Sequence, residues 1–146
     1  NLHLAQTPNH VVFLHEMIHE YRIIPLDENH DLPRGFKQWF GHSRGHWDGD
    51  TLVIETTGFD ARQLLRRLSL SGMRLIERVT RLDADTLRYD VSFIDPELWS
   101  QPWTASLMMP PSEGPMFEYA CHEGNVGMTN ILEFARLDET TNGREP

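Results

Sequence analysis

The stretch from Gly41 to Phe59, GHSRGHWDGDTLVIETTGF, carries the clearest structural signal in the chain. Its Asp-Gly-Asp sequence at residues 48–50 tolerates the left-handed backbone of a tight turn, and the apolar, β-branched run at residues 51–57 is typical of a strand. The stretch therefore predicts a β-hairpin. The segment before the turn is unusually dense in functional side chains, which we interpret as candidate substrate contacts: His42, Arg44, His46 and Trp47.

The totals point to a globular protein. The chain has 146 residues, of which 39% are hydrophobic and 24% charged, enough for one domain with its own core. Its net charge of −9 repels nucleic acid and anionic membrane surfaces, and no apolar run approaches the roughly 18 residues of a spanning helix. We therefore expect neither nucleic acid nor a membrane as a partner, while a homo-oligomer is compatible with the sequence. The single cysteine, Cys121, excludes an intramolecular disulfide.

Alternation of apolar and polar side chains predicts further strands. The hairpin at residues 74–94 is the clearest case, because every second residue from Leu87 to Phe93 is apolar. Residues 60–73 are the best helical candidate, with Asp60 as the cap and a structured loop as the alternative. Residues 131–137 read as a short helix or an edge strand. Other strands are expected at residues 11–16, 21–26, 104–109 and 116–124.

These elements define the expected fold class. Six to eight antiparallel strands joined by close turns, with one or two short helices and no β-α-β alternation, predict an all-β, mainly antiparallel protein. We expect a lipocalin-like barrel or half-barrel meander that spans residues 1–146 as a single domain, because closure removes exposed strand edges. An eight-stranded barrel can hold one small ligand.

The segment His15 to His19, HEMIH, matches the H-E-x-x-H pattern of zinc proteases. On a helix this spacing places two imidazoles on one face for Zn²⁺. The flanks, however, are rich in β-branched and aromatic residues, and Arg22 and Pro25 stand where the extended metal pattern needs Gly and His. We therefore favour a hairpin, with strands at 11–16 and 21–26 joined by a turn at 17–20.

Ionisable groups within apolar strands are the candidate catalytic residues, because a buried charge is costly without a partner or a role. On the first hairpin, His19 would act as a general base, Glu16 would orient it and Arg22 would hold an anion. Glu77 and Arg78 are more simply explained by cross-strand ion pairs. The candidate substrate contacts are His42, Arg44, His46, Trp47, Tyr119, His122, Glu123 and Asn125.

Three functions remain open from these residues. The first is an enzyme that acts on a small, partly apolar organic molecule in the barrel mouth by cofactor-free acid–base chemistry: elimination, isomerisation or hydrolysis. The second is a non-catalytic, lipocalin-like ligand carrier. The third is a zinc or copper hydrolase whose ligands come from His15, His19, His42, His46 and His122.

Several motifs resemble a large, uncharacterised family of small exported proteins from soil bacteria. The likeness covers roughly residues 6–130 and rests on QTP at residues 6–8, GxxxGxWxGDTLV at 41–53 and EYxCxEGN at 118–125. The resemblance implies a periplasmic or secreted location but no particular reaction. Because the chain does not begin with Met, we also expect that an upstream segment has been removed, and a signal peptide is one candidate.

Overall fold

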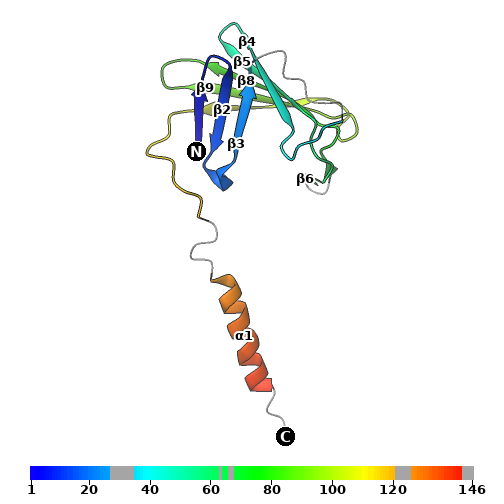
Figure 1. Cartoon of the computed structure of the whole chain (residues 1–146), viewed down its shortest axis with the longest axis vertical. Coiled ribbons are helices and arrows are strands. Elements are labelled where there is room, and N and C mark those ends of the chain that lie inside the picture. Colours follow the sequence, from blue (N-terminus) through cyan, green and yellow to red (C-terminus); the bar gives the residue numbers. More distant parts are fainter. Residues whose placement is uncertain (27–34, 63, 66–67, 121–125, 143–146) are drawn as a thin grey trace. The chain divides into compact units, whose positions relative to one another are not determined.

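The computed structural model describes residues 1–26, 35–62, 64–65, 68–120 and 126–142 (Figure 1). The chain divides into two compact units, Asn1–Met116 and Phe117–Pro146. The described strands all lie in the first unit, and the second contains the helix α1 (Gly127–Asn142). The β fold that we predicted for the chain as a whole therefore belongs to the first unit.

The N-terminal segment forms a three-stranded antiparallel sheet in the order β1-β2-β3. A single 3-10 turn, η1 (Met17–His19), joins its last two strands. This arrangement confirms the predicted hairpin, so HEMIH is part of a strand and a turn and does not have the helical geometry of a zinc protease motif. The strands are β1 (Leu2–Gln6), β2 (His10–His15) and β3 (Tyr21–Pro25).

The middle of the chain forms a five-stranded antiparallel sheet in the order β10-β9-β8-β5-β4. The hairpin predicted at residues 41–59 is its β4–β5 pair, with Gly49 at a φ of 59° in the turn. The predicted hairpin at residues 74–94 is confirmed as its β8–β9 pair. The strands are β4 (His42–Asp48), β5 (Thr51–Thr57), β8 (Arg74–Arg81), β9 (Leu87–Ile94) and β10 (Trp103–Met109).

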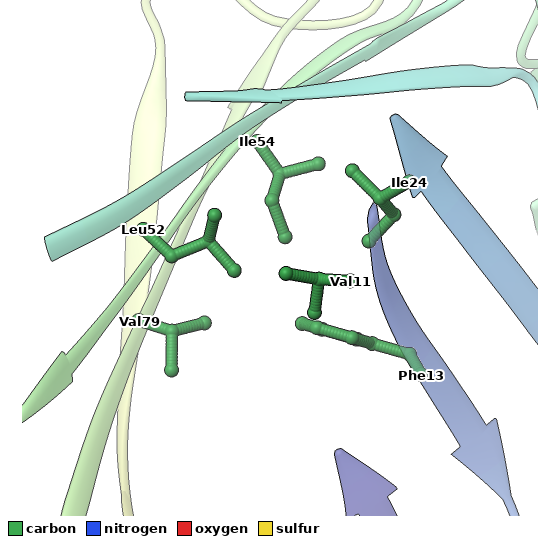
Figure 2. Close-up of a cluster of buried hydrophobic side chains, with 6 residues drawn as sticks. All are labelled: Val11, Phe13, Ile24, Leu52, Ile54 and Val79. Carbon is green, nitrogen blue, oxygen red and sulfur yellow. The ribbon is translucent and has the colours of Figure 1, made fainter. Parts of the chain in front are cut away.

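The two sheets share one hydrophobic core, shown in Figure 2. Period-2 alternation places every second side chain of each strand on the inner face, where the apolar residues of both sheets meet. Within the described residues the sheets do not close into a barrel, so the fold is an antiparallel half-barrel meander. The buried residues of this core are Val11, Phe13 and Ile24 from the first sheet and Leu52, Ile54 and Val79 from the second.

The helix predicted at residues 60–73 is wrong. The chain instead forms a small strand pair, β6 (Leu64–Leu65) with β7 (Leu68–Ser69). The Asp60 carboxylate accepts hydrogen bonds from the backbone and side-chain N–H groups of Arg62, at 2.8 and 2.9 Å for Oδ1. Such local side-chain contacts stabilise turns in competition with helix.

The strand predicted at residues 116–124 is also wrong for residues 116–120, which are not part of any sheet; residues 121–125 lie outside the described residues. Three prolines, at positions 110, 111 and 115, follow β10, and proline cannot donate to a strand ladder. The helical alternative for residues 131–137 is confirmed, and α1 extends beyond it at both ends.

Candidate functional site

Glu77 is a carboxylate inside the core. It lies on β8 opposite Ile54 of β5 and Val91 of β9, on the same face of the sheet as Val79. Its side chain is only 2% exposed. Because an unpaired buried carboxylate costs several kcal/mol, Glu77 must be held by specific partners.

Arg22 of β3 supplies the main partner from the other sheet. Its Nη1 and Nη2 donate to Oε2 and Oε1 of Glu77, both at 2.8 Å, in a two-pronged ion pair. The Tyr89 hydroxyl donates to Oε1 at 2.6 Å. The Arg22 guanidinium also lies 5.1 Å above the centre of the Phe13 ring. The pair therefore joins the two sheets at a defined distance.

A chain of hydroxyl groups leads from Glu77 to β4. The Thr56 hydroxyl donates to Oε2 of Glu77 at 3.4 Å and lies 2.8 Å from the Ser43 hydroxyl. A hydroxyl has one proton to donate, so Ser43 is the donor to Thr56. The Ser43 oxygen can still accept a hydrogen bond. The chain of hydroxyl groups therefore connects the buried carboxylate of Glu77 to the start of β4.

The pKa values show that this network is charged. Burial alone would raise the pKa of Glu77, but the hydrogen bonds and positive charge of Arg22, with the Tyr89 and Thr56 hydroxyls, hold it below its usual range. Burial acts to lower the pKa of Arg22, and Glu77 outweighs it, so that pKa is raised. Burial and the Glu77 charge raise the pKa of Tyr89. These directions favour the carboxylate form of Glu77 and the phenol form of Tyr89 at neutral pH.

A pocket of about 320 Å³ opens beside this network. Its lining residues include three aromatic residues and four polar or charged ones. Arg22 and Ser43 belong both to the network and to the pocket wall. The lining residues are Tyr21, Arg22, Ile23, Gln38, Trp39, Phe40, Gly41, His42 and Ser43.

The segment before β4 is held in place by its backbone. The Gln38 N–H donates to the Gly58 carbonyl at 3.0 Å, and the Gln38 carbonyl accepts from Asp60 at 2.8 Å and from Gly41 at 3.1 Å. Gly41 has a φ of 71°, and a Cβ there would lie 2.8 Å from the Thr57 carbonyl oxygen. Only glycine fits at this position, so the backbone that follows Trp39 and Phe40 depends on Gly41.

Of the three predicted catalytic residues, Arg22 is the one that lines the pocket. It is also bound to Glu77. Glu16 accepts a hydrogen bond from Asn1 Nδ2 at 2.6 Å, and the exposed His19 is the last residue of η1, with a φ of 54°. Neither Glu16 nor His19 lines the pocket, so a catalytic role for the trio as a unit stays a prediction.

Of the predicted substrate contacts, His42 lines the pocket. Arg44 and His46 follow on the same face of β4, opposite to Ser43, and Trp47 lies exposed near the end of that strand. Tyr119 belongs to the second unit. The other three, His122, Glu123 and Asn125, lie outside the described residues.

The proposed metal ligands are spread over several elements. His42 and His46 lie four residues apart on one strand, which separates them by roughly 13 Å. In the described part of the chain, no group of three or more His, Cys, Asp or Glu side chains is placed to hold a metal ion. His122 lies outside that part. The described helices also include none that is long and apolar enough to cross a membrane.

Sequence reasoning missed most of the network. It gave Glu77 a cross-strand partner, whereas the partner comes from the other sheet, and it did not single out Thr56, Tyr89 or Trp39. One signal was available: Glu77 alternates with Leu75 and Val79, so it had to lie on the apolar face of its strand. Arg78, on the other face, does form the predicted type of ion pair, with Asp48 at 2.9 Å.

Comparisons with models of protein families, with curated proteins and with solved structures found no match. The chemistry of the pocket is therefore the basis for the function proposed below.

Proposed function

We propose that this protein binds a small, partly apolar organic molecule in the pocket beside the Arg22–Glu77 pair. One observation carries the proposal: a pocket of about 320 Å³ is lined by three aromatic residues together with Arg22 and Ser43, whose side chains belong to the hydrogen-bond network of a buried carboxylate. Binding sites typically combine mostly apolar walls with a few placed polar groups. The function is that of a binding or carrier protein.

The polar groups indicate which ligand chemistry fits. Two of the five N–H donors of Arg22 are used by Glu77, so others remain to serve an acceptor such as a carbonyl or carboxylate oxygen. The Ser43 oxygen suits a donor on the same ligand. Because Glu77 neutralises Arg22, a neutral or singly charged ligand fits better than a polyanion. Trp39 and Phe40 favour a planar or cyclic apolar part.

A fragment screen tests the proposal with a matched pair of variants. Small aromatic acids, amides and lactones are screened by ligand-observed NMR against the wild-type protein, Trp39→Ala and Trp47→Ala. Both tryptophans are similarly exposed, 50% and 47%, but only Trp39 lines the pocket. We expect fragments whose affinity falls at least tenfold in Trp39→Ala and is unchanged in Trp47→Ala. A screen without binders, or binders insensitive to Trp39→Ala, would overturn the proposal.

Cofactor-free acid–base catalysis is the second candidate, favoured by the presence of His42 among the residues that line the same pocket as Arg22. A histidine near neutral pH is a competent base, and Arg22 could hold a developing anion. The test is to incubate each bound fragment with the protein and follow its conversion by NMR. Turnover that is lost in His42→Asn while binding is retained would support an enzyme. Fragments that bind but are not converted would support only the binding function.

A further inference from the structure

β10 is an edge strand without the usual protection. Among the strands that the structure describes, it is paired on one side only, with β9. Natural edge strands carry charges, internal prolines or bulges that prevent pairing with another chain. Residues 100–112, which contain β10, have no charged residue in a chain that is 24% charged. The seven residues of β10 thus present an uncharged row of backbone donors and acceptors.

Three large apolar side chains of this edge are exposed. Trp103 is 41% exposed, Leu107 54% and Met108 62%. The Trp103 ring stacks on Phe93 of β9, with centroids 4.2 Å apart and planes 12° from parallel. The edge is therefore held against its own sheet, while no described strand pairs with its outer side. Apolar side chains along an open edge favour a second strand rather than solvent.

We propose that β10 pairs antiparallel with β10 of a second copy of this chain, about a two-fold axis at Ser106. Pro102 precedes the strand and Pro110 follows it, each four residues from Ser106. Because proline ends a ladder, each copy offers the same number of residues for pairing on either side of Ser106. The two five-stranded sheets then form one continuous sheet.

The register places no two charged residues of β10 opposite each other. On the inner face Trp103 lies opposite Met109 of the second copy, and Ala105 opposite Leu107. On the outer face Thr104 lies opposite Met108, and Ser106 meets its own equivalent. A chain of net charge −9 repels its copies over most of its surface, but this strand places no like charges together.

A charge introduced at the axis tests the pairing. In Ser106→Glu and Ser106→Lys, like charges lie directly opposite across the axis, so we expect the dimer dissociation constant to rise at least tenfold in sedimentation velocity. An equimolar mixture of the two variants should dimerise again, because Glu then faces Lys. Leu82→Lys, at an exposed site outside β10, is the control and should dimerise like the wild type. A monomeric wild type at about 100 µM, or a dimer unaffected by either charge, would overturn the proposal.

Cross-linking checks the register independently of those charges. In a Cys121→Ser background, Ser106→Cys places two thiols on directly opposed residues, about 5 Å apart between Cα atoms, which suits a disulfide. Met108→Cys is the matched control, since its two copies are roughly 13 Å apart in this register. We expect a disulfide-linked dimer for the first variant only. Equal cross-linking of both, or of neither, would contradict pairing about Ser106; capture of an unrelated extended peptide in place of a second copy would contradict it too.

Discussion

Glu77 is the residue on which the packing of the two sheets depends most. Removing its charge leaves the Arg22 guanidinium buried without a counter-ion, and breaking a buried pair in this way typically costs 3–5 kcal/mol. We expect Glu77→Gln to lower the free energy of unfolding by about that amount, measured by urea denaturation. The control is Glu55→Gln, which removes the partner of Arg74 in an exposed ion pair and should cost far less. Equal losses in the two variants would contradict the role of Glu77.

The same residue should make stability depend on acid pH. The folded-state pKa of Glu77 is depressed, so its contribution is fully present above its unfolded pKa of about 4.3 and is lost as the pH falls through the lower folded value. We therefore expect the difference in unfolding free energy between wild type and Glu77→Gln to be constant from about pH 7 to 5 and to shrink below about pH 4. Urea titrations across this range measure it. A constant difference at all pH values would argue against a depressed pKa.

Gly41 in the connection before β4 and Gly49 in the β4–β5 turn both have a left-handed backbone. Both have a positive φ, 71° and 59°, but only at Gly41 would a Cβ collide with neighbouring atoms. Left-handed backbone costs alanine about 1–2 kcal/mol at either position, and the collision adds to it at Gly41. Gly41→Ala should therefore lower the melting temperature clearly more than Gly49→Ala. Equal shifts would show that the wall segment can relax.

The β elements could be predicted from local pattern, and the errors have physical causes. The hairpins at residues 41–59 and 74–94 follow from turn residues and period-2 alternation, which are local signals. The supposed helix at residues 60–73 failed because Asp60 stabilises a turn through Arg62 rather than a helix start. The pocket could not be predicted, since Arg22 and Glu77 are 55 residues apart and meet only when the sheets pack.

The whole chain separates into two compact units, and all described strands and the hydrophobic core belong to Asn1–Met116. A fragment of residues 1–116 should therefore fold by itself, with a cooperative thermal transition and a β-type far-ultraviolet circular dichroism spectrum. Its melting temperature should lie within a few degrees of that of the full chain. A fragment that is unfolded at 20 °C would show that the second unit is required for the β fold.

The proposed ligand site is the pocket beside the Arg22–Glu77 pair. The most direct test is an amide chemical-shift titration of ¹⁵N-labelled protein with the best-binding fragment. The largest shifts should fall at residues 21–23 and 38–43. A second pocket, of about 250 Å³ and lined in part by Leu2, Leu87 and Met109, provides the contrast within the same spectrum. Shifts confined to that second pocket, or spread evenly over the surface, would contradict the claim.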